Sequence, residues 1–228
     1  NKLLIFYQSA KKSNLSIIKH KKKWITFVGK LNKAKGYDVF AKTIVKILNK
    51  YPNWEAKIIG DEKREKIPLN HKKASIMGFK KHSEVLNIFK KTSITVACSR
   101  WEEPFGRTSL EASANGCAVI ITNKGGLPET VTDAKIISNL NIKNLFKSIK
   151  NLIENTKLRN KLQTLSIKNF YLTHKYVSAK IDFYRSEKLS FKKNIFFKIK
   201  DKSLRILHVT NFNERLDGRL FFNTGRRL

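Results

Sequence analysis

The sequence predicts an α/β fold in which a parallel β-sheet carries helices on both faces. Short, wholly apolar segments alternate with longer segments whose apolar residues recur every three or four positions. Successive apolar segments start about 16 to 31 residues apart, which leaves room for a helix between most of them and is too far for a tight hairpin. This alternation is typical of right-handed βαβ units, and a sheet buried on both faces explains why its strands are apolar throughout.

The predicted elements follow one another from residue 24 to residue 137. Residues 24–28 form the first strand, Gly29 ends it, and apolar residues with helical spacing then continue to Leu48 before Pro52 breaks the pattern. Later strands are expected at 55–60, 74–78, 93–97, 118–122 and 134–137, with helices near 85–89, 108–115 and 128–131. Residues 141–189 are polar with apolar stripes, which predicts a helical C-terminal segment.

Four segments divide the chain. Residues 24–190 are expected to form a Rossmann-like domain of ordinary size. Residues 1–23 contain seven Lys and no acidic residue, which indicates a basic linker or the tail of a missing domain, and residues 191–203 indicate a second basic linker. Residues 204–228 open with the apolar run Leu-Arg-Ile-Leu-His-Val-Thr, which predicts a stray terminal strand. The first residue is Asn, and we expect a fragment of a longer protein.

The strong positive charge has two explanations. The 228 residues include 48 Lys and Arg against 17 Asp and Glu, a net charge of +31, which is typical of nucleic-acid binding. However, 38 of the 48 basic residues are Lys, and Asn is frequent at 20, as in products of AT-rich genomes. Arg reads bases and phosphates better than Lys does. We therefore favour compositional bias and expect no specific nucleic acid; the alternative is a noncatalytic nucleotide- or nucleic-acid-binding module.

Several other classes of protein do not fit the sequence. No run of eighteen apolar residues is present, which argues against a transmembrane helix. Two cysteines, Cys98 and Cys117, are too few for a disulfide scaffold, and we expect no signal peptide. We expect a cytoplasmic protein. Basic residues 1–23 and the basic, Phe-bearing residues 188–205 are candidates for peripheral contact with the inner face of a membrane, and ordinary Lys-rich linkers are the alternative.

The densest group of polar residues follows the fourth predicted strand. Gly106 allows the backbone to approach a ligand closely, and Thr108 and Ser109 stand where a helix begins, so that free N–H groups there favour a phosphate. Glu103 and Glu111 are expected to face one pocket, where carboxylates accept hydrogen bonds from sugar hydroxyls. The alternative is a capping box with Thr108 at the N-cap and Glu111 at the third helical position.

Two further loops follow strands. Lys30 and Lys35 lie between the first strand and its helix and are candidates for neutralising a diphosphate leaving group, although a solvated loop is the alternative in so Lys-rich a chain. Residues 122–129 contain a Gly-Gly turn followed by Pro-Glu, which a simple connection from strand to helix explains. Because ligands bind outside the carboxyl ends of parallel strands, the chemistry is expected in these loops.

Together the three loops form a more specific pattern. Their order is Gly-Lys-Leu-x-x-x-Lys-Gly, then Ser-x-x-x-Glu-Pro-Phe-Gly-x-x-x-Leu-Glu-Ala-x-Ala-x-Gly, then Thr-x-x-Gly-Gly-x-Pro-Glu. With these motifs, residues 24–190 resemble the C-terminal, donor-binding domain of GT-B glycosyltransferases. The resemblance is to the retaining enzymes of glycosyltransferase family four, also called group 1 glycosyl transferases.

The resemblance implies a role for each matching residue. The catalytic candidates are Lys30 and Lys35, on the diphosphate, and Glu103, beside the donor sugar; the family has Arg where this chain has Lys30. Glu111 is expected to hold the ribose hydroxyls. The other donor-binding candidates are Gly29, Gly78, Phe79, Phe105, Gly106, Arg107, Thr108 and Ser109.

The resemblance also implies a reaction. A sugar moves with retention from a nucleotide sugar to a hydroxyl of a carbohydrate or lipid-linked acceptor, in the synthesis of envelope polysaccharide or glycolipid. No metal and no other cofactor is expected, because two cations take the place of a metal. The acceptor site belongs to an N-terminal domain that residues 1–23 are too short to form, so we expect the isolated chain to be inactive. The tail from residue 204 resembles the start of another such domain, and an epimerase of the same fold is the remaining rival.

Overall fold

Six parallel strands form the central layer of the molecule. The computed structural model describes residues 5–191, with side chains to residue 186. The strands are β1 (Lys22–Val28), β2 (Glu55–Ile59), β3 (Ala74–Ile76), β4 (Thr92–Ala97), β5 (Ala118–Thr122) and β6 (Ala134–Ile137). Their order across the sheet is β3-β2-β1-β4-β5-β6, and every neighbouring pair is parallel. The predicted fold class is confirmed, and the winding reverses between β1 and β4, where ligands bind in such sheets.

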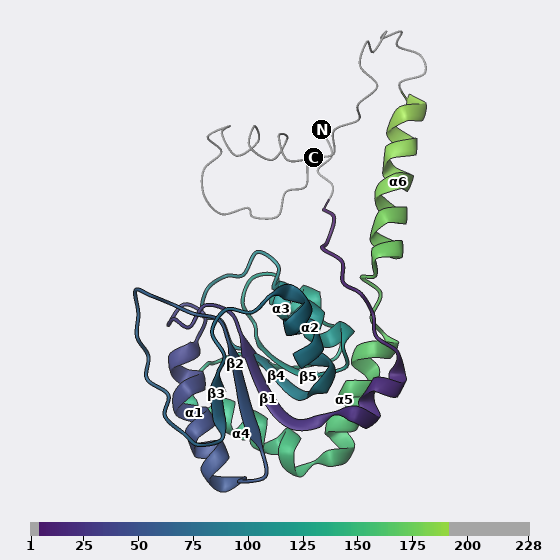
Figure 1. Cartoon of the computed structure of the whole chain (residues 1–228). Coiled ribbons are helices and arrows are strands. Elements are labelled where there is room, and N and C mark those ends of the chain that lie inside the picture. The colour runs from purple at the N-terminus through teal and green to yellow at the C-terminus, as the bar shows by residue number, and fades with distance from the viewer. Residues whose placement is uncertain (1–4, 192–228) are drawn as a thin grey trace.

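Helices cover both faces of the sheet, as predicted (Figure 1). Helices α1 (Tyr37–Lys50) and α4 (Ile142–Glu154) share one apolar core with the sheet, and α2 (His82–Lys91) and α3 (Arg107–Ala114) share the other. Helix α5 (Thr156–Lys168) contacts α3, α4 and β5. Helix α6 (His174–Phe191) follows and completes the predicted helical C-terminal segment; the predicted linker at 191–203 and strand within 204–228 lie outside the described residues, apart from Phe191 at the helix end.

The central strand β5 shows why the strands are apolar at every position. Ala118 and Ile120 belong to the core beneath α1 and α4, whereas Val119 and Ile121 belong to the core beneath α2 and α3. All four side chains are fully buried. Burying one large aliphatic side chain contributes about 1.5–3 kcal/mol, so both faces of the strand stabilise the fold and neither needs a polar residue.

The N-terminal segment, interpreted above as a basic linker or the tail of a missing domain, contacts the domain at several points. Ala10 is buried, and its N–H donates to the carbonyl oxygen of Leu172 at 3.0 Å. After the short 3₁₀ helix η1 (Leu15–His20), the ammonium of Lys21 donates to the carbonyl oxygens of Phe89, at 2.9 Å, and Asn115, at 2.6 Å. The basic charge of this segment indicated a linker or the tail of a missing domain, and in the structure its backbone and one lysine donate to acceptors on the domain.

Candidate functional site

A cavity opens at the carboxyl ends of β1 and β4, at the reversal of the strand order. Its volume is about 460 Å³. Its walls are the ends of β1 and β4, Lys35, the loop and first turn at 103–108, and two residues from elsewhere in the chain, Gln8 and Leu127. The cavity therefore lies where parallel sheets of this order bind ligands.

Most of the residues predicted for the site line this cavity. They are Gly29, Lys35, Glu103, Phe105, Gly106, Arg107 and Thr108. The side chains of Lys30 and Phe79 are exposed, Phe79 at 80%, and neither Lys30, Gly78 nor Phe79 lines the cavity. Ser109 is fully buried, and its hydroxyl bonds to the carbonyl oxygen of Gly106 and to Thr130 Oγ1, both at 2.7 Å. Its hydroxyl thus braces the start of α3.

An ion pair lies within the cavity. The ammonium of Lys35 is 2.6 Å from Oε1 and 2.8 Å from Oε2 of Glu103. The side chain of Glu103 is 12% exposed and that of Lys35 is 33% exposed, so solvent screens this pair less than an ordinary surface pair. A cation and an anion from two loops, 68 residues apart in sequence, therefore face the same space.

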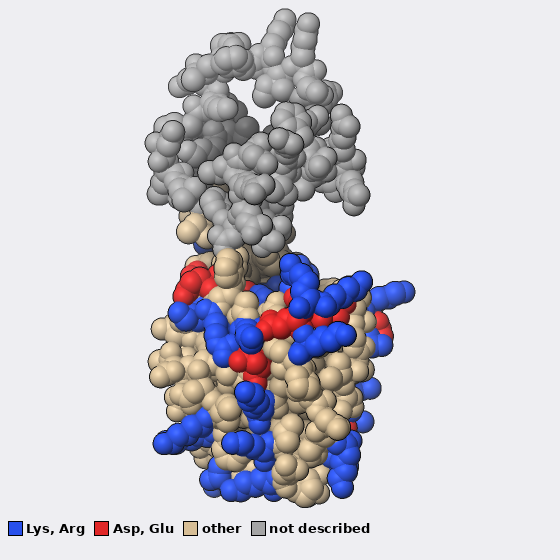
Figure 2. Space-filling model, turned by 90° about the vertical axis from the view of Figure 1, so that its left-hand side faces the viewer, with Lys and Arg blue, Asp and Glu red and all other residues tan. Residues whose placement is uncertain are grey.

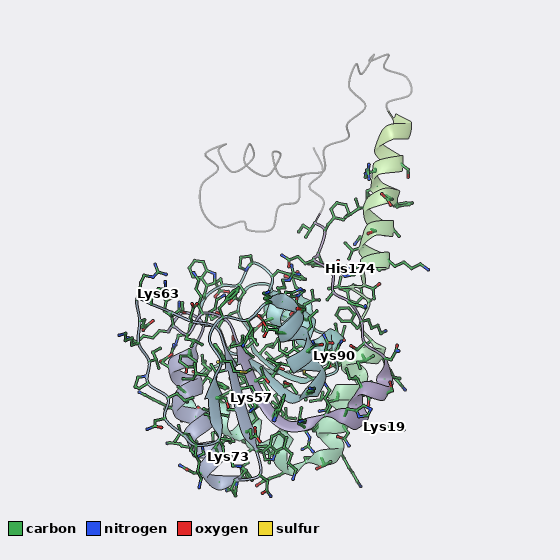
Figure 3. The ribbon with its side chains drawn as sticks, viewed as in Figure 1. Lys19, Lys57, Lys63, Lys73, Lys90 and His174 are labelled. Carbon is green, nitrogen blue, oxygen red and sulfur yellow. The ribbon has the colours of Figure 1, made fainter. Side chains whose placement is uncertain are left out.

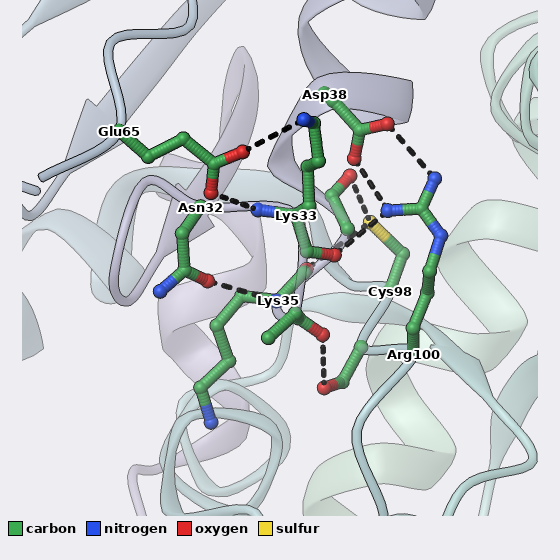
Figure 4. Close-up of polar contacts among 10 residues, drawn as sticks. Asn32, Lys33, Lys35, Asp38, Glu65, Cys98 and Arg100 are labelled. Atoms are coloured by element: carbon green, nitrogen blue, oxygen red, sulfur yellow. Dashed lines mark hydrogen bonds and ion pairs between the residues drawn. The ribbon is translucent and has the colours of Figure 1, made fainter.

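The loop that carries Lys35 is held in a defined turn (Figure 4). Asn32 accepts from the N–H of Lys35 at 3.1 Å, and Arg100 donates to the carbonyl oxygen of Lys33 at 2.7 Å. The hydrogen bond from Arg100 also lowers the pKa of the Asp38 carboxyl, at the start of α1. Figure 4 shows the Lys35 side chain extending away from these contacts. The backbone of the loop is fixed, and its lysine remains available to the cavity.

The loop that carries Glu103 is held by the Gly-Gly turn after β5. The N–H of Gly126 donates to the carbonyl oxygen of Glu103 at 2.6 Å, and the N–H of Gly125 donates to Glu102 Oε2 at 2.6 Å. A side chain at Gly126 would stand 2.7 Å from the carbonyl oxygen of Pro104. The Gly-Gly turn of the third sequence motif therefore does more than connect a strand to a helix, because it also supports the loop that carries Glu103.

Helix α3 begins at the cavity wall without a side-chain cap. Gly106 is its N-cap in the left-handed region, at φ 95°, and makes no side-chain cap hydrogen bond. The capping box considered for Thr108 and Glu111 is wrong, because Thr108 already lies inside the helix and Glu111 has other partners. The first N–H groups of an α-helix have no acceptor within the helix, and the macrodipole is positive there. Residues 106–108 form this end of the helix and line the cavity. The N–H donors at the start of α3 therefore favour the binding of an anion there.

Arg107 and His82 both contact the same carboxylate oxygen of Glu111. Its side chain is 8% exposed, and its Oε1 lies 2.7 Å from Nε of Arg107 and 2.8 Å from Nε2 of His82. Glu111 does not line the cavity, but Arg107 does. Sequence reasoning treated His82 as a solvated or packed histidine and missed this contact, because His82 lies 29 residues from Glu111 and no motif contains it.

Gln8 is the second functional candidate that sequence reasoning missed. It lines the cavity, although it lies in the segment interpreted as a linker. No motif marks it, and its place depends on how residues 5–13 pack against the domain. The only signal in the sequence was a polar, uncharged side chain within a Lys-rich segment, which is too weak to predict a site.

Basic side chains are dispersed over the surface. Figure 2 shows Lys and Arg spread over the visible face of the domain, with Asp and Glu gathered near its upper part. The lysines labelled in Figure 3 lie apart from one another around the domain, on helices, on a strand and in the connection between β2 and β3. They are Lys19, Lys57, Lys63, Lys73 and Lys90. Such dispersion fits a compositional excess of Lys better than a single stripe for a nucleic-acid backbone.

Comparison with known proteins identifies the family. The model of the glycosyl transferases group 1 matches residues 9–168 of this chain. The chain belongs to this family. The match begins within the segment interpreted as a linker, which agrees with the packing of that segment against the domain.

Relatives and solved structures share this domain. The lipopolysaccharide core biosynthesis mannosyltransferase LpsB of Rhizobium meliloti is 29% identical over 121 residues, which are 49% of this chain and 34% of that protein. The C-terminal domain of the group 1 family protein LpcC from Francisella tularensis has a TM-score of 0.58 at 25% identity, covering 77% of this chain and 95% of that one. Anabaena Alr3699/HepE in complex with UDP-glucose has a TM-score of 0.67 at 16% identity, covering 80% of this chain and 57% of that one. The matched region spans about a third of the length of the curated relatives.

Two further features are absent from the part of the chain that the structure describes. No helix within residues 5–191 is long and apolar enough to cross a membrane. No group of three or more His, Cys, Asp or Glu side chains arranged for a metal ion lies within the same residues.

Proposed function

We propose that this chain provides the nucleotide-sugar site of a retaining glycosyltransferase, which moves a sugar to a hydroxyl of its acceptor. The observation that carries the proposal is the Lys35–Glu103 pair in a cavity beside the start of α3, within a chain of the group 1 family. A diphosphate needs cations and N–H donors, and a sugar needs carboxylate acceptors. One cavity supplies both.

The diphosphate is assigned to Lys35 and to the N-terminal end of α3. Negative charge on the leaving diphosphate grows in the transition state, so a fixed cation and oriented N–H groups stabilise it more than they stabilise the bound donor. Lys30 follows Gly29, which lines the cavity, and its exposed side chain has the length to turn toward an anion. With two lysines in these roles, the reaction is proposed to proceed without a divalent metal or other cofactor.

The sugar and the ribose are assigned to the two glutamates. Glu103 stands in the cavity and would accept hydrogen bonds from hydroxyls of the transferred sugar once the donor draws Lys35 toward its diphosphate. Glu111 is proposed to accept from the ribose hydroxyls, and its Oε2 is the oxygen that Arg107 and His82 leave for them. The backbone near Gly78 and Phe79 is proposed to border the base.

The acceptor is proposed to be a carbohydrate or lipid-linked hydroxyl in an envelope polysaccharide or glycolipid pathway. Support comes from the family and from the name of the LpsB relative, a lipopolysaccharide core mannosyltransferase. We propose that a separate N-terminal domain completes the acceptor site, since this chain matches only about a third of its curated relatives. A cytoplasmic location, with contact at the inner face of the membrane, suits an enzyme that uses both nucleotide sugars and such acceptors.

Thermal unfolding with a panel of nucleotide sugars tests the proposal. UDP-glucose, GDP-mannose and ADP-glucose are added to the chain, and at about one hundred times Kd the correct donor should raise Tm by about 5–10 °C. The matched controls are the free sugars and an oligothymidylate of similar total charge. Stabilisation by the oligonucleotide alone, lost by about 0.2 M salt, would instead support the nucleic-acid-binding alternative.

A further inference from the structure

An imidazole from a neighbouring helix contacts the carboxylate of Glu111. His82 is the first residue of α2, and Glu111 lies within α3. Nε2 of His82 is 2.8 Å from Oε1 of Glu111. An ionised carboxylate only accepts hydrogen bonds, so His82 donates from Nε2. The contact therefore directs one ring nitrogen of His82 at one oxygen of Glu111.

Arg107 donates to the same oxygen of Glu111. Its Nε lies 2.7 Å from Oε1, and the two residues are four positions apart on α3. A carboxylate oxygen has about two sites that accept a hydrogen bond, so His82 and Arg107 together occupy Oε1. Oε2 has no hydrogen-bond partner among the described residues and is not one of their buried, unpartnered atoms, so it is in contact with solvent. The carboxylate thus has one held oxygen and one free oxygen.

The free oxygen lies beside the cavity. Arg107 lines the cavity wall and also contacts Glu111, which itself does not line the cavity. A nucleotide sugar with its diphosphate in the cavity would place its next group, the ribose, outside the cavity. A ribose hydroxyl donates a hydrogen, and a free carboxylate oxygen accepts one. The arrangement of Glu111 therefore suits a ribose as long as Oε1 stays held.

Helix α2 does not need the His82 side chain to begin. Glu84 accepts from the N–H of Lys81 at 2.9 Å, and its own N–H donates to the carbonyl oxygen of Lys81 at 3.0 Å, so Glu84 closes the first turn. The side chain of His82 is 56% exposed, and a pair with so exposed a partner contributes little to stability. The contact is therefore explained better by its effect on the Glu111 carboxylate than by the stability of the fold.

The two partners of Glu111 differ in how a bound donor would affect them. Arg107 is a cation in the cavity wall, so a diphosphate would attract it away from Glu111. His82 does not line the cavity and would keep its contact. His82 is thus the partner that can hold Oε1 while the donor is bound.

We propose that His82 is a positioning residue for the nucleotide, which holds Oε1 of Glu111 so that Oε2 is directed at the ribose hydroxyls. This inference rests on the proposed function, because it takes Glu111 as the acceptor for the ribose. It adds α2 to the donor site and gives a residue that no sequence motif contains a part in nucleotide recognition.

Calorimetric titration with paired nucleotides tests the inference. The full chain is titrated with UDP, GDP and ADP and with the 2′,3′-dideoxy form of each. In the parent chain, loss of the ribose hydroxyls should weaken the nucleotide that binds by about tenfold or more, because hydrogen bonds to a carboxylate are lost. In His82→Phe, which keeps a ring and removes the donor, that nucleotide should weaken at least about threefold and its dideoxy form should not change.

Two further variants serve as controls. His82→Gln keeps an N–H donor at nearly the same reach and should retain the preference of the parent chain for ribose. His20→Phe makes the same substitution at an exposed histidine that does not line the cavity, and it should bind every ligand as the parent chain does. The Tm of the free His82→Phe chain should stay within about 4 °C of the parent, since the pair contributes little to stability.

The possible results distinguish the inference from the proposed function. Equal weakening of a nucleotide and its dideoxy form in His82→Phe, no weakening of either, or a His82→Gln variant that behaves like His82→Phe would overturn the role of His82 and leave the proposed function standing. A parent chain that binds a nucleotide and its dideoxy form equally would overturn the ribose role of Glu111 together with this inference. A parent chain that binds none of the nucleotides would overturn the proposed function as well.

Discussion

Lys35 and Glu103, two of the charged residues that line the cavity, neutralise each other in the free protein. The Lys35 ammonium contacts both oxygens of Glu103, so neither residue carries an uncompensated charge while the site is empty. A diphosphate carries more negative charge than one carboxylate, and the N–H groups of α3 add to its attraction. Binding is therefore expected to shift Lys35 from the carboxylate to the diphosphate and to free Glu103 for the sugar. Lys35 and Glu103 would then form an ion pair in the free protein and contact the donor in the bound state.

Replacing Lys35 should test whether its ammonium binds the diphosphate. The Lys35→Ala variant should weaken nucleoside diphosphate binding about tenfold or more, because it loses a charge-assisted hydrogen bond and leaves Glu103 to repel the ligand. Lys30→Ala should also weaken it if the sequence-based assignment of Lys30 is correct. Titration calorimetry at constant ionic strength measures both.

The same loop offers a matched control. Lys33 pairs with Glu65 at 3.3 Å, is 72% exposed and does not line the cavity. Lys33→Ala removes the same charge from the same loop and should leave affinity nearly unchanged. Equal losses in the Lys33 and Lys35 variants would show a general effect of net charge and contradict the assigned role of Lys35.

At the scale of elements, the start of α1 packs closely against the end of β4. Gly36 is the N-cap of α1 at φ 71°, and a side chain on it would overlap the carbonyl oxygen of Cys98, at the end of β4. Gly78 has a similar φ of 65° but open space around it. A side chain at Gly78 would cost only the strain of the left-handed backbone, whereas a side chain at Gly36 would add a steric clash.

Alanine at these two positions should therefore differ in effect. Gly78→Ala should lower the free energy of unfolding by about 1 kcal/mol, the strain of a left-handed alanine. Gly36→Ala should lower it by more than about 2 kcal/mol, because α1 must also move away from β4. Urea denaturation of both variants makes the comparison, and equal losses would contradict the close packing at Gly36.

A half-buried lysine joins the ends of two other helices. Lys21 donates to the carbonyl oxygen of Phe89, in the last turn of α2, and to that of Asn115, at the C-cap of α3. Carbonyl groups at the end of a helix lack a full set of partners within it. A cation is favourable at a helix C-terminus. Burial lowers the pKa of Lys21 from 10.5, because desolvation disfavours the charged form.

Replacing Lys21 should destabilise the domain and change its response to pH. Lys21→Met should lower the free energy of unfolding by about 1–3 kcal/mol, since the Asn115 carbonyl loses its lysine donor and the Phe89 carbonyl loses one of its donors. The folded-state pKa lies below 10.5, so the unfolded chain binds more protons between these two values. The contribution of this ionisation is therefore fully present above pH 10.5 and is lost as pH falls through the folded-state pKa.

Denaturation of the parent chain and the variant across pH 7–10.5 measures this difference. The advantage of the parent chain should grow as pH rises. Lys23→Met, at an exposed position of β1, is the matched control and should stay within about 0.5 kcal/mol of the parent chain. A constant difference between the Lys21 variant and the parent would contradict the lowered pKa of Lys21.

At the scale of the whole molecule, binding and turnover are expected to separate. The donor cavity is formed within the described residues, whereas the proposed acceptor site is supplied by another domain. A binding site on one domain provides little rate enhancement until the second reactant is oriented against it. This domain should therefore bind a donor even without the domain that is proposed to supply the acceptor site.

The purified chain of 228 residues should bind a nucleotide sugar without transferring its sugar. Release of nucleoside diphosphate from the donor that stabilises the chain, measured with and without carbohydrate and lipid-linked acceptors, should stay at the level of the buffer. Robust turnover by this chain alone would contradict the proposed division of labour. Donor binding by the same sample is the control for folding.

Much of the fold and part of the site could be predicted because their signals are local. Apolar runs and helical spacing placed each of the six strands and the helices that cover them, usually within two residues. The loop motifs placed Lys35 and Glu103 in loops of one site, and both side chains line one cavity, while their roles toward a ligand stay predictions. The start of α3 was also predicted within one residue, although the capping box was not formed, because Gly106 ends the loop without a side-chain cap.

The sequence by itself determined the order of the elements, the loops that carry the site and the family, because periodicity, turn residues and motif spacing are properties of neighbouring residues. Only the tertiary structure decided which side chains meet. It paired Lys35 with Glu103, placed His82 against Glu111, set Lys21 between two helices and brought Gln8 to the cavity. These contacts depend on the order of strands and the packing of a segment without a motif, which bring together residues that no local pattern connects.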